Sequence, residues 1–340
     1  MDQDEAPNAS RGRGKALTMQ DVAAAAKVSS MTVSNSFRHP SRVQPETRKR
    51  VLTVAAELGY VPNLSAGLLA AGASRVIGSI LPSIRNSSFF HYTMGLRSAA
   101  NEAGREVITM IAETPEDELS AVETLLGLRV AGIAVVGGAR HDLTRALLSR
   151  SGVPVAESWA SEQPIGFGIH YDVGAASAEM TCHLLGTGRR RIGFVGFSSG
   201  DRSRYAERLP AFRHAMFQAG LPDDLVLSIR EADGFGAGPR VIEELLALEP
   251  KIDAILCPTD IVAAGAIFEC SRRGLKVPDD IAVAGWGNYD IGVQISPALT
   301  TIEPNSHSMG AAAVGLLLGP APAGAGPLRV PYQFLRRDSA

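Results

Sequence analysis

The chain has 340 residues, of which 45% are hydrophobic and 20% charged, and its formal net charge is −2. This length suits two or three structural units, and the composition is typical of a globular protein. No apolar run approaches a membrane span, and no apolar segment of a secretory signal precedes the first helical pattern. Cys182, Cys257 and Cys270 include no CxxC pair, which argues against a disulfide framework and against zinc. We therefore expect a cytoplasmic protein without membrane contact.

The charge is unevenly distributed along the chain. Nine Lys and Arg residues and only two acids lie between Arg11 and Arg50, so this segment carries +7 while the rest is acidic. A basic end on an acidic chain predicts a polyanionic partner. Residues 1–17 alternate acids with Arg and Gly and predict a disordered tail.

Three short helical patterns follow the tail. Thr18 is placed to cap the first helix, with Asp21 three residues later to reach back to it. Ser29 is placed to cap the second helix. Pro45 suits the first turn of the third helix, which Gly59 ends.

From residue 75 onward, strands that are apolar throughout alternate with amphipathic helices. Strands of this kind predict parallel sheets that helices cover on both faces. The series is long enough for two such sheets, and ligands of doubly wound sheets bind beyond the carboxyl ends of the strands. The predicted strands cover residues 76–81, 107–111, 132–136, 153–156, 192–197, 254–257 and 281–284, and the predicted helices include 116–126, 175–185, 206–219 and 261–273.

Several runs of residues carry a resemblance to a known family. They are 19–23 (MQDVA) with 28–34 (VSSMTVS), 58–63 (LGYVPN), 258–260 (PTD) and 274–285 (GLKVPDDIAVAG). In this order they are similar to the helix-turn-helix, the link into the hinge and the core of the lactose-repressor (LacI) family of transcriptional regulators. The likeness extends from Thr18 to about Pro331. Within the family, 267–270 (IFEC) and 286–292 (WGNYDIG) most resemble the gluconate-operon repressors.

The resemblance implies a small all-α helix-turn-helix DNA-binding domain and an α/β two-lobed core, like a periplasmic binding protein, with parallel doubly wound sheets. The implied boundaries are a disordered tail at 1–17, the helix-turn-helix domain at 18–63, a hinge helix or linker at 64–74 and an effector-binding and dimerisation core at 75–337. Within the core, the N-lobe comprises about 75–168 and 303–319, and the C-lobe about 169–302 and 320–337.

The second helix of a helix-turn-helix lies in the major groove with its first residues at the base edges. Asn35 departs from the family, which usually has Arg at this position. An amide suits the donor and acceptor of adenine, whereas Arg suits guanine, so we expect a changed base preference; contact with only a phosphate or water remains the alternative. The predicted DNA contacts are Thr18, Met19, Ser29, Ser30, Met31, Thr32, Ser34, Asn35, Tyr60, Asn63, Ala66 and Leu69.

The resemblance also implies a hinge helix that enters the minor groove, with Leu69 as an apolar wedge and Ala66 beside it. Gly67 in so short a helix costs about 1 kcal/mol relative to Ala. A helix of about two turns is marginal in water, so we expect it to order on operator only. An inert Ala/Gly linker is the alternative.

The family places its effector between the two lobes. The candidates are Asn86, Phe89, Phe90, Arg208, Asp260, Trp286, Gly287 and Asn288. Core packing is the alternative for the two phenylalanines, a surface charge for Arg208 and a helix cap for Asp260. Relatives that bind neutral sugars commonly have Asp where this chain has Gly287. Loss of that carboxylate beside a retained Arg208 favours an anion, such as the sugar acid gluconate.

The predicted partners are a pseudo-palindromic double-stranded DNA operator, a small-molecule effector and a second copy of the chain in a homodimer. No catalytic residue, metal or cofactor is expected. The run 196–200 (GFSSG) fits the GxSxG pattern of serine hydrolases, but no convincing helix begins directly at Ser198, as that mechanism requires. A free-standing sugar-binding protein would need a signal peptide and would not need residues 18–72.

Overall fold

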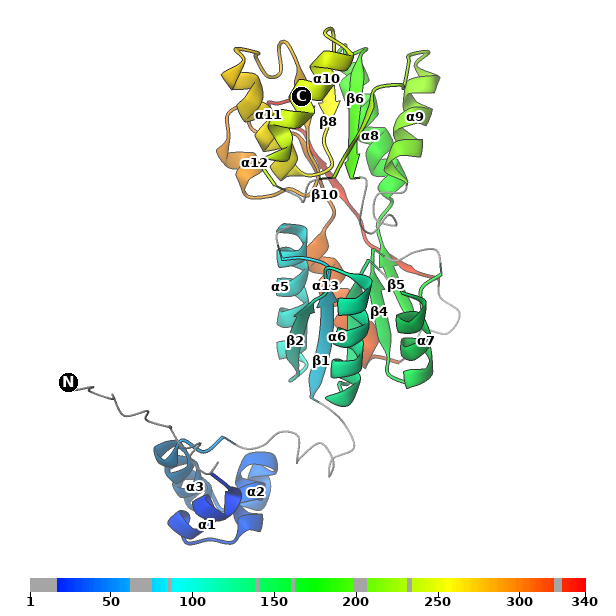
Figure 1. Ribbon diagram of the computed structural model, residues 1–340. Helices are drawn as coiled ribbons and strands as arrows, with labels where there is room; N and C mark the ends of the chain where they lie inside the picture. Colours follow the sequence, from blue (N-terminus) through cyan, green and yellow to red (C-terminus); the bar gives the residue numbers. More distant parts are fainter. Residues whose placement is uncertain are drawn as a thin grey trace, which may run out of the picture. The chain divides into compact units, whose positions relative to one another are not determined.

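The structure is a computed structural model that describes residues 17–61, 75–84, 87–137, 141–159, 163–197, 207–230, 234–320 and 326–340. The chain divides into two compact units, Met1–Gly72 and Ala73–Ala340 (Figure 1). Asn63, Ala66, Leu69, Asn86 and Ser198 lie outside the described residues. Within the described ranges, none of the helices combines the length and the apolar character that crossing a membrane requires.

The described part of the first unit contains three α-helices around a small apolar core. The helices are α1 Met19–Ala26, α2 Ser30–Arg38 and α3 Pro45–Leu58, with a 3-10 turn at Pro40–Arg42. Each helix contributes to the core, which is formed by Val22, Ala23, Ala26, Val33, Val51, Ala55 and Tyr60.

The predicted helix ends of the first unit are confirmed. The Thr18 hydroxyl accepts the backbone N–H of Asp21, and the Asp21 carboxylate accepts the backbone N–H of Thr18 at 2.7 Å. Ser29 accepts the backbone N–H of Thr32 at 3.1 Å. Gly59 ends α3 at a φ of +70°, which favours glycine. Each such N-cap stabilises its helix by about 1 kcal/mol.

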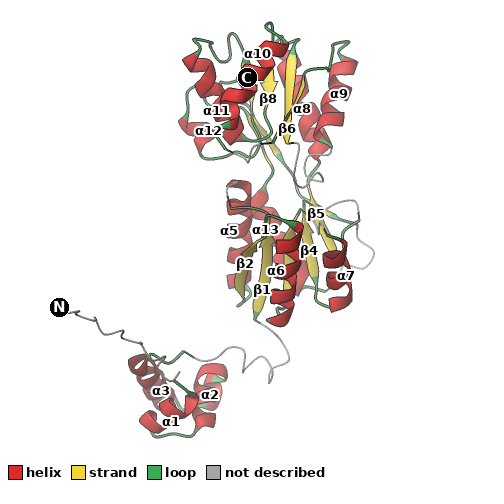
Figure 2. Ribbon diagram, viewed as in Figure 1, coloured by secondary structure: helices red, strands yellow, loops and turns green. Residues whose placement is uncertain are grey.

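The second unit has two lobes, each built on a parallel sheet. The N-lobe sheet has the strand order β11-β5-β4-β3-β1-β2. Figure 2 shows strands of this sheet with helices packed against them. Helices α5 and α13 cover one face of it, and α6 and α7 cover the other. The strands are β1 Val76–Leu81, β2 Glu106–Ile111, β3 Gly132–Val136, β4 Val155–Ser158, β5 Phe167–His170 and β11 Leu328–Arg329; the helices are α5 Ser87–Glu102, α6 Pro115–Gly127, α7 Asp142–Ser151 and α13 Ser306–Leu318.

The C-lobe sheet has the order β7-β6-β8-β9, with α8 and α9 on one face and α10 and α11 on the other. Its strands are β6 Ile192–Phe197, β7 Val226–Ile229, β8 Ala254–Leu256 and β9 Ala282–Ala284; its helices are α8 Val173–Gly186, α9 Arg208–Gln218, α10 Ala237–Leu248, α11 Asp260–Arg272 and α12 Ile291–Gln294. A separate antiparallel pair joins β10 Thr301–Glu303 to β12 Gln333–Leu335.

The predicted lobe boundaries are wrong at two points. Strand β5 pairs with β4 and therefore belongs to the N-lobe, so the chain enters the C-lobe after His170. Strand β11 pairs with β5, so Leu328–Arg329 also belongs to the N-lobe rather than to the C-lobe. The chain thus passes between the lobes three times, after β5, after β10 and after β11.

Helices α5 and α13 touch through their backbones. A Cβ on Gly310 would lie 2.0 Å from the carbonyl oxygen of Tyr92, and a Cβ on Gly95 would lie 2.0 Å from that of His307. Only glycine permits so close an approach. The contact joins the first helix of the N-lobe to the helix that follows the second crossover.

Candidate functional site

The first turn of α2 presents polar side chains and one apolar side chain to solvent. Met31 is 69% exposed, Ser29 and Ser30 are exposed, and Val33 on the opposite side is fully buried. Thr32, Ser34 and Asn35 are half-buried. This arrangement leaves Ser30 and Met31 accessible, while Val33 fixes the helix on its domain.

Two residues predicted to contact DNA, Met19 and Tyr60, pack in or against the apolar core of the domain. The ring of Tyr60 is 9% exposed, and its centroid lies 6.2 Å from that of Phe37. Met19 is half-buried and packs against the same core. Tyr60 therefore packs inside the domain, and its large apolar ring is the physical reason.

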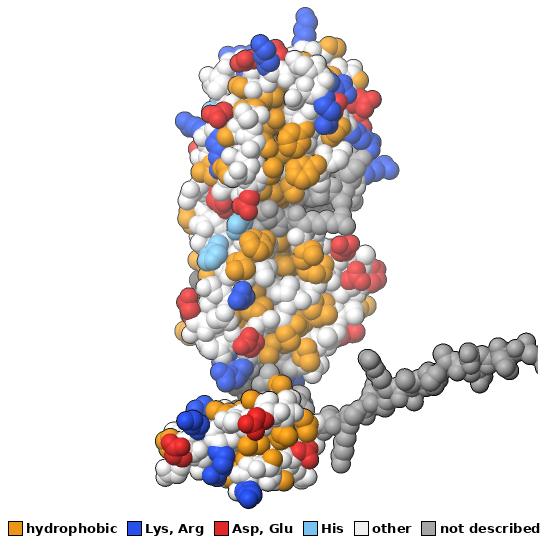
Figure 3. All heavy atoms as spheres, turned by 90° about the vertical axis from the view of Figure 1, so that its left-hand side faces the viewer, with side chains coloured by type: hydrophobic (Ala, Val, Ile, Leu, Met, Phe, Trp, Pro, Cys, Tyr) orange, Lys and Arg blue, Asp and Glu red, His pale blue; other side chains and the backbone are white. Residues whose placement is uncertain are grey.

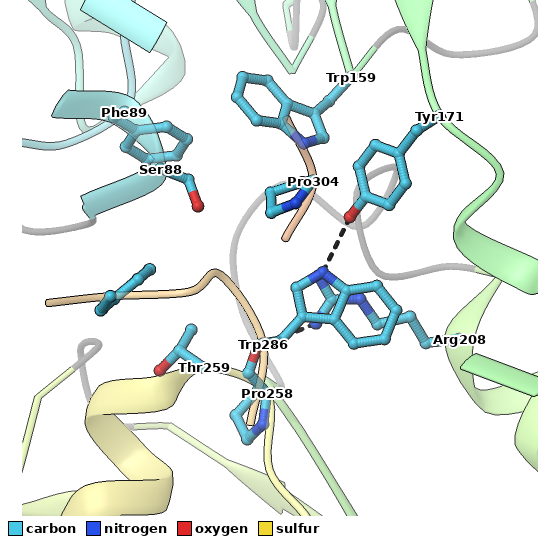
Figure 4. A pocket seen from close by; sticks show the side chains of 10 residues that line it. Ser88, Phe89, Trp159, Tyr171, Arg208, Pro258, Thr259, Trp286 and Pro304 are labelled. Carbon is cyan, nitrogen blue, oxygen red and sulfur yellow. Dashed lines mark hydrogen bonds between the residues drawn. The ribbon is translucent and has the colours of Figure 1, made fainter. Parts of the chain in front are cut away.

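The second unit has a small pocket between its lobes. Its lining comes from both lobes and from two crossovers, and several residues directly follow the carboxyl ends of β4, β5, β8 and β9. Ligands of doubly wound sheets bind at such strand ends. The lining residues are Ser88, Phe89, Trp159, Tyr171, Arg208, Pro258, Thr259, Trp286, Tyr289 and Pro304 (Figure 4).

Arg208, in the first turn of α9, is the one charged side chain among the described residues that line the pocket. It is 6% exposed, and its guanidinium carbon lies 3.7 Å from the centroid of the Trp286 ring. Its Nη1 donates to the carbonyl oxygen of Pro258 at 2.9 Å. The indole Nε1 of Trp286 donates to the Tyr171 hydroxyl at 2.9 Å (Figure 4). Stacking on the indole and bonding to a carbonyl hold the cation in a fixed plane.

Aromatic rings form the N-lobe wall of the pocket. Phe89 meets the edge of Trp159 with ring centroids 5.9 Å apart, and Tyr92 packs against Trp159 from behind at 5.6 Å. The Ser158 hydroxyl donates to the Tyr92 hydroxyl at 3.2 Å. Burial raises the pKa of Tyr92 to about 12, against a smaller lowering by this hydrogen bond, so the phenol stays neutral.

The structure brings Phe89, Arg208 and Trp286 together, as the sequence predicted. Phe90, by contrast, is 58% exposed and is absent from the pocket lining, because successive residues of α5 point to different sides of the helix. Core packing for Phe89 is also observed, since the ring is both buried and part of the lining.

Asp260 and Asn288 lie behind the pocket rather than in its lining. The fully buried carboxylate of Asp260 accepts the Thr301 hydroxyl at 2.5 Å and the backbone N–H of Tyr289 at 2.7 Å. The N-cap of α11 is Thr259, so Asp260 is not the helix cap either. Asp260 thus supports the loop that carries Trp286 and Tyr289.

Gly287 is also absent from the pocket lining, and its backbone explains the residue type. Its φ is +123°, and a Cβ at this position would lie 2.2 Å from Cε1 of Tyr289. The Tyr289 ring, which does line the pocket, thus takes the space beside residue 287.

Sequence reasoning missed several lining residues that the strand ends place in the pocket. Trp159 follows β4, Tyr171 follows β5, and Pro258 with Thr259 follows β8. For Trp159, Pro258 and Thr259, the position shortly after a predicted strand was the available signal, whereas the strand before Tyr171 was not predicted. Ser88, Tyr289 and Pro304 had no comparable signal.

No metal or nucleophile site is evident in the described part of the chain. The His, Cys, Asp and Glu side chains of these ranges form no group of three suited to a metal ion. Cys257 precedes Pro258 of the pocket, but burial raises the pKa of its thiol, which therefore stays neutral.

Comparisons with family models and with known proteins agree on one family. Residues 18–63 match bacterial regulatory proteins of the lacI family, and residues 181–340 match a periplasmic binding protein-like domain. The HTH-type transcriptional regulator GntR of Escherichia coli (strain K12) is 31% identical over 308 residues, which are 89% of this chain and 92% of the relative.

Solved structures agree with this match. A LacI family transcriptional regulator from Silicibacter pomeroyi has a TM-score of 0.85 at 27% identity, covering 95% of this chain and 99% of that chain. The lac repressor dimer bound to operator and an anti-inducer has a TM-score of 0.81 at 25% identity, covering 96% and 99%. These relatives are regulators and not enzymes, which disfavours a hydrolase based on Ser198. The chain belongs to the LacI family of DNA-binding transcriptional regulators.

Proposed function

We propose that this regulator represses genes of sugar-acid catabolism and that a small anionic sugar acid, such as gluconate, controls its affinity for operator. The observation that carries the proposal is the buried guanidinium of Arg208, stacked on Trp286 in the pocket between the lobes. The resemblance of residues 267–270 and 286–292 to gluconate-operon repressors supports the same ligand class.

The chemistry of the lining favours a carboxylate. A guanidinium in a site of low dielectric attracts an anion more strongly than it would in water. Its planar fork matches the two oxygens of a carboxylate. No Asp or Glu is among the described lining residues, whereas the rings of Phe89, Trp159 and Trp286 offer apolar walls.

We propose a homodimer that binds a pseudo-palindromic operator. A twofold dimer presents two equivalent α2 helices to two half-sites, and the related lac repressor is a dimer on its operator. Figure 3 shows hydrophobic side chains gathered over both lobes on the side where α5 and α11 lie. Apolar patches of this kind mark protein interfaces. Exposed apolar residues of α5, β2 and α11 are Phe90, Met94, Ile108, Ile111 and Phe268.

The pocket lies between the lobes, so a ligand bound there can control the affinity of the protein for DNA. A ligand that touches both lobes favours one arrangement of them only if it binds that arrangement more tightly. The operator and the ligand must then change each other's affinity by the same factor.

A ligand panel tests the proposal. The protein is screened by thermal shift against gluconate, related aldonates, glucose and purines, because a ligand that binds only the folded state raises the Tm. We expect aldonates alone to raise the Tm and to change operator affinity in a gel-shift assay. A shift only with neutral sugars or purines would refute the sugar-acid assignment and leave the family assignment standing.

A further inference from the structure

The carboxylate of Glu303 accepts hydrogen bonds from two asparagines that both have a left-handed backbone conformation. Asn288 has a φ of +50° and Asn305 a φ of +56°. The Nδ2 of Asn288 donates to Oε2 of Glu303 at 2.8 Å, and the backbone N–H of Asn305 donates to Oε1 of Glu303 at 2.9 Å. Left-handed backbone is uncommon for residues other than glycine and persists where the surroundings enforce it.

Neither asparagine lines the pocket, but each is a neighbour in the chain of residues that do. Asn288 lies in the loop between Trp286 and Tyr289, which forms part of the C-lobe wall. Asn305 is the N-cap of α13, the N-lobe helix that touches α5, and α5 carries Phe89. Glu303 ends β10 at the crossover between the lobes, directly before the lining residue Pro304.

The hydrogen bonds of this cluster have a fixed direction. Nη2 of Arg337 donates to Oδ1 of Asn288 at 2.6 Å, and the Asn288 amide donates onward to Glu303. Arginine only donates and a carboxylate only accepts, so the Asn288 amide has one orientation that satisfies both neighbours. The carboxylate at residue 303 therefore fixes the orientation of the Asn288 side chain in the loop that carries Trp286.

We propose that Glu303 is a positioning residue of the effector pocket, which locks the loop 286–289 and the start of α13 into one geometry. Through this lock, a ligand held by Arg208 and Trp286 acts on α13 and on its partner α5. The inference rests on the proposed function, since it takes the pocket as the effector site.

Reversing the polarity of the cluster tests the inference. In Glu303→Gln, either the Asn288 amide or the backbone N–H of Asn305 faces the new amide N–H, whichever way the glutamine side chain turns. In Asn288→Asp, two carboxylates face each other. In the double variant, the new amide at position 303 donates to the new carboxylate at position 288, which still accepts from Arg337, while the amide oxygen at position 303 still accepts from Asn305. Glu244→Gln on α10, at a partly exposed residue paired with Arg240, is the matched control.

The readout is the intrinsic fluorescence of the two tryptophans, Trp159 and Trp286, which both line the pocket. We expect each single variant to weaken gluconate binding by about tenfold or more, because hydrogen bonds to charged groups are lost. The double variant regains most of the affinity, and Glu244→Gln matches the parent. Wild-type affinity in Glu303→Gln, or a double variant no better than the singles, overturns the inference.

A ligand-free readout separates this inference from the proposed function. In a Trp159→Phe background, the near-ultraviolet circular dichroism of Trp286 reports the loop alone. Failure of the parent to bind gluconate refutes the sugar-acid assignment. If the Trp286 signal then still changes in both singles and returns in the double variant, the positioning role stands; an unchanged signal refutes it.

Discussion

The ring of Tyr289 fills the space that a side chain at residue 287 would occupy, since a Cβ on Gly287 would lie 2.2 Å from Cε1 of Tyr289. The φ of +123° at Gly287 also disfavours any residue with a Cβ. The family resemblance implies Asp at this position in relatives that bind neutral sugars. The absence of that carboxylate is thus built into the conformation of the loop, and Tyr289 lines the pocket in its place.

Gly287→Asp should destabilise the protein without creating a neutral-sugar site. We expect a loss of about 2–5 kcal/mol in the free energy of unfolding, from backbone strain and overpacking against Tyr289. Thermal and denaturant unfolding measure it. Gly236→Asp is the control, because Gly236 has a negative φ and a Cβ there would meet no atom within 4 Å, so this change adds neither strain nor a clash. Equal Tm values for the two variants would contradict this account.

Arg208→Met should weaken gluconate binding by about a hundredfold, the effect of losing hydrogen bonds to a charged group. Arg208→Lys should fall in between, because it keeps the charge without the planar fork. Isothermal titration calorimetry measures both. Arg213→Met, an exposed position on the same helix, is the control and should bind like the parent. Unchanged affinity in Arg208→Met would show that the ligand does not use this cation.

Local features of the fold could be predicted from the sequence, whereas features that depend on distant partners could not. The Thr18 cap was visible because its partner Asp21 is three residues away. Asp260 was assigned to the ligand because its partner Thr301, 41 residues later, has no signature in the sequence. The two-residue strand β11 was missed because only its pairing with β5 defines it as a strand.

The residues of the candidate site also differ in whether they could be predicted from the sequence. Arg208 and Trp286 were predicted because the family resemblance covers the segments around them. Thr259 and Tyr171 were missed because their role depends on the ends of strands converging from both lobes. Gly287 was identified because it departs from the family pattern. The reason for the glycine, the Tyr289 ring that occupies the space beside it, is seen only in the folded loop.

Gly310→Ala should separate α5 from α13. The new methyl group would lie 2.0 Å from the carbonyl oxygen of Tyr92, a backbone atom that cannot yield without moving the helix. We expect a loss of about 1–3 kcal/mol in unfolding free energy, as for other overpacked sites. Gly315→Ala on the same helix meets no atom within 4 Å and should stabilise the protein by about 0.5–1 kcal/mol. Denaturant unfolding of the pair checks both signs, and a stabilised Gly310→Ala would refute the close contact.

Glu157→Gln should raise stability at neutral pH. Glu157 is fully buried in β4; desolvation raises its pKa, while the Ile165 N–H and Arg145 lower it and Glu118 raises it further. Because the folded pKa lies above the unfolded value, the folded state binds more protons, and stability falls as pH rises from the unfolded pKa through the folded pKa. Glu157→Gln has no carboxyl to ionise at this position, so its stability does not fall with pH for this reason. Tm values measured across pH 4–8 should therefore diverge in favour of Glu157→Gln as pH rises, and parallel curves would contradict the raised pKa.

The base that Asn35 contacts is open to a direct test by operator selection. Asn35 lies on the half-buried side of α2, after the exposed residues of its first turn. An amide pairs with adenine and a guanidinium with guanine, each preference being worth about 1–3 kcal/mol. We expect operators selected from random DNA by the parent and by Asn35→Arg to differ at one base pair in each half-site, with guanine chosen by the variant. Lys49→Ala, an exposed cation of α3, should instead lower affinity for all sequences alike. If the parent and Asn35→Arg select the same base, Asn35 contacts the backbone or water, and the changed preference is refuted.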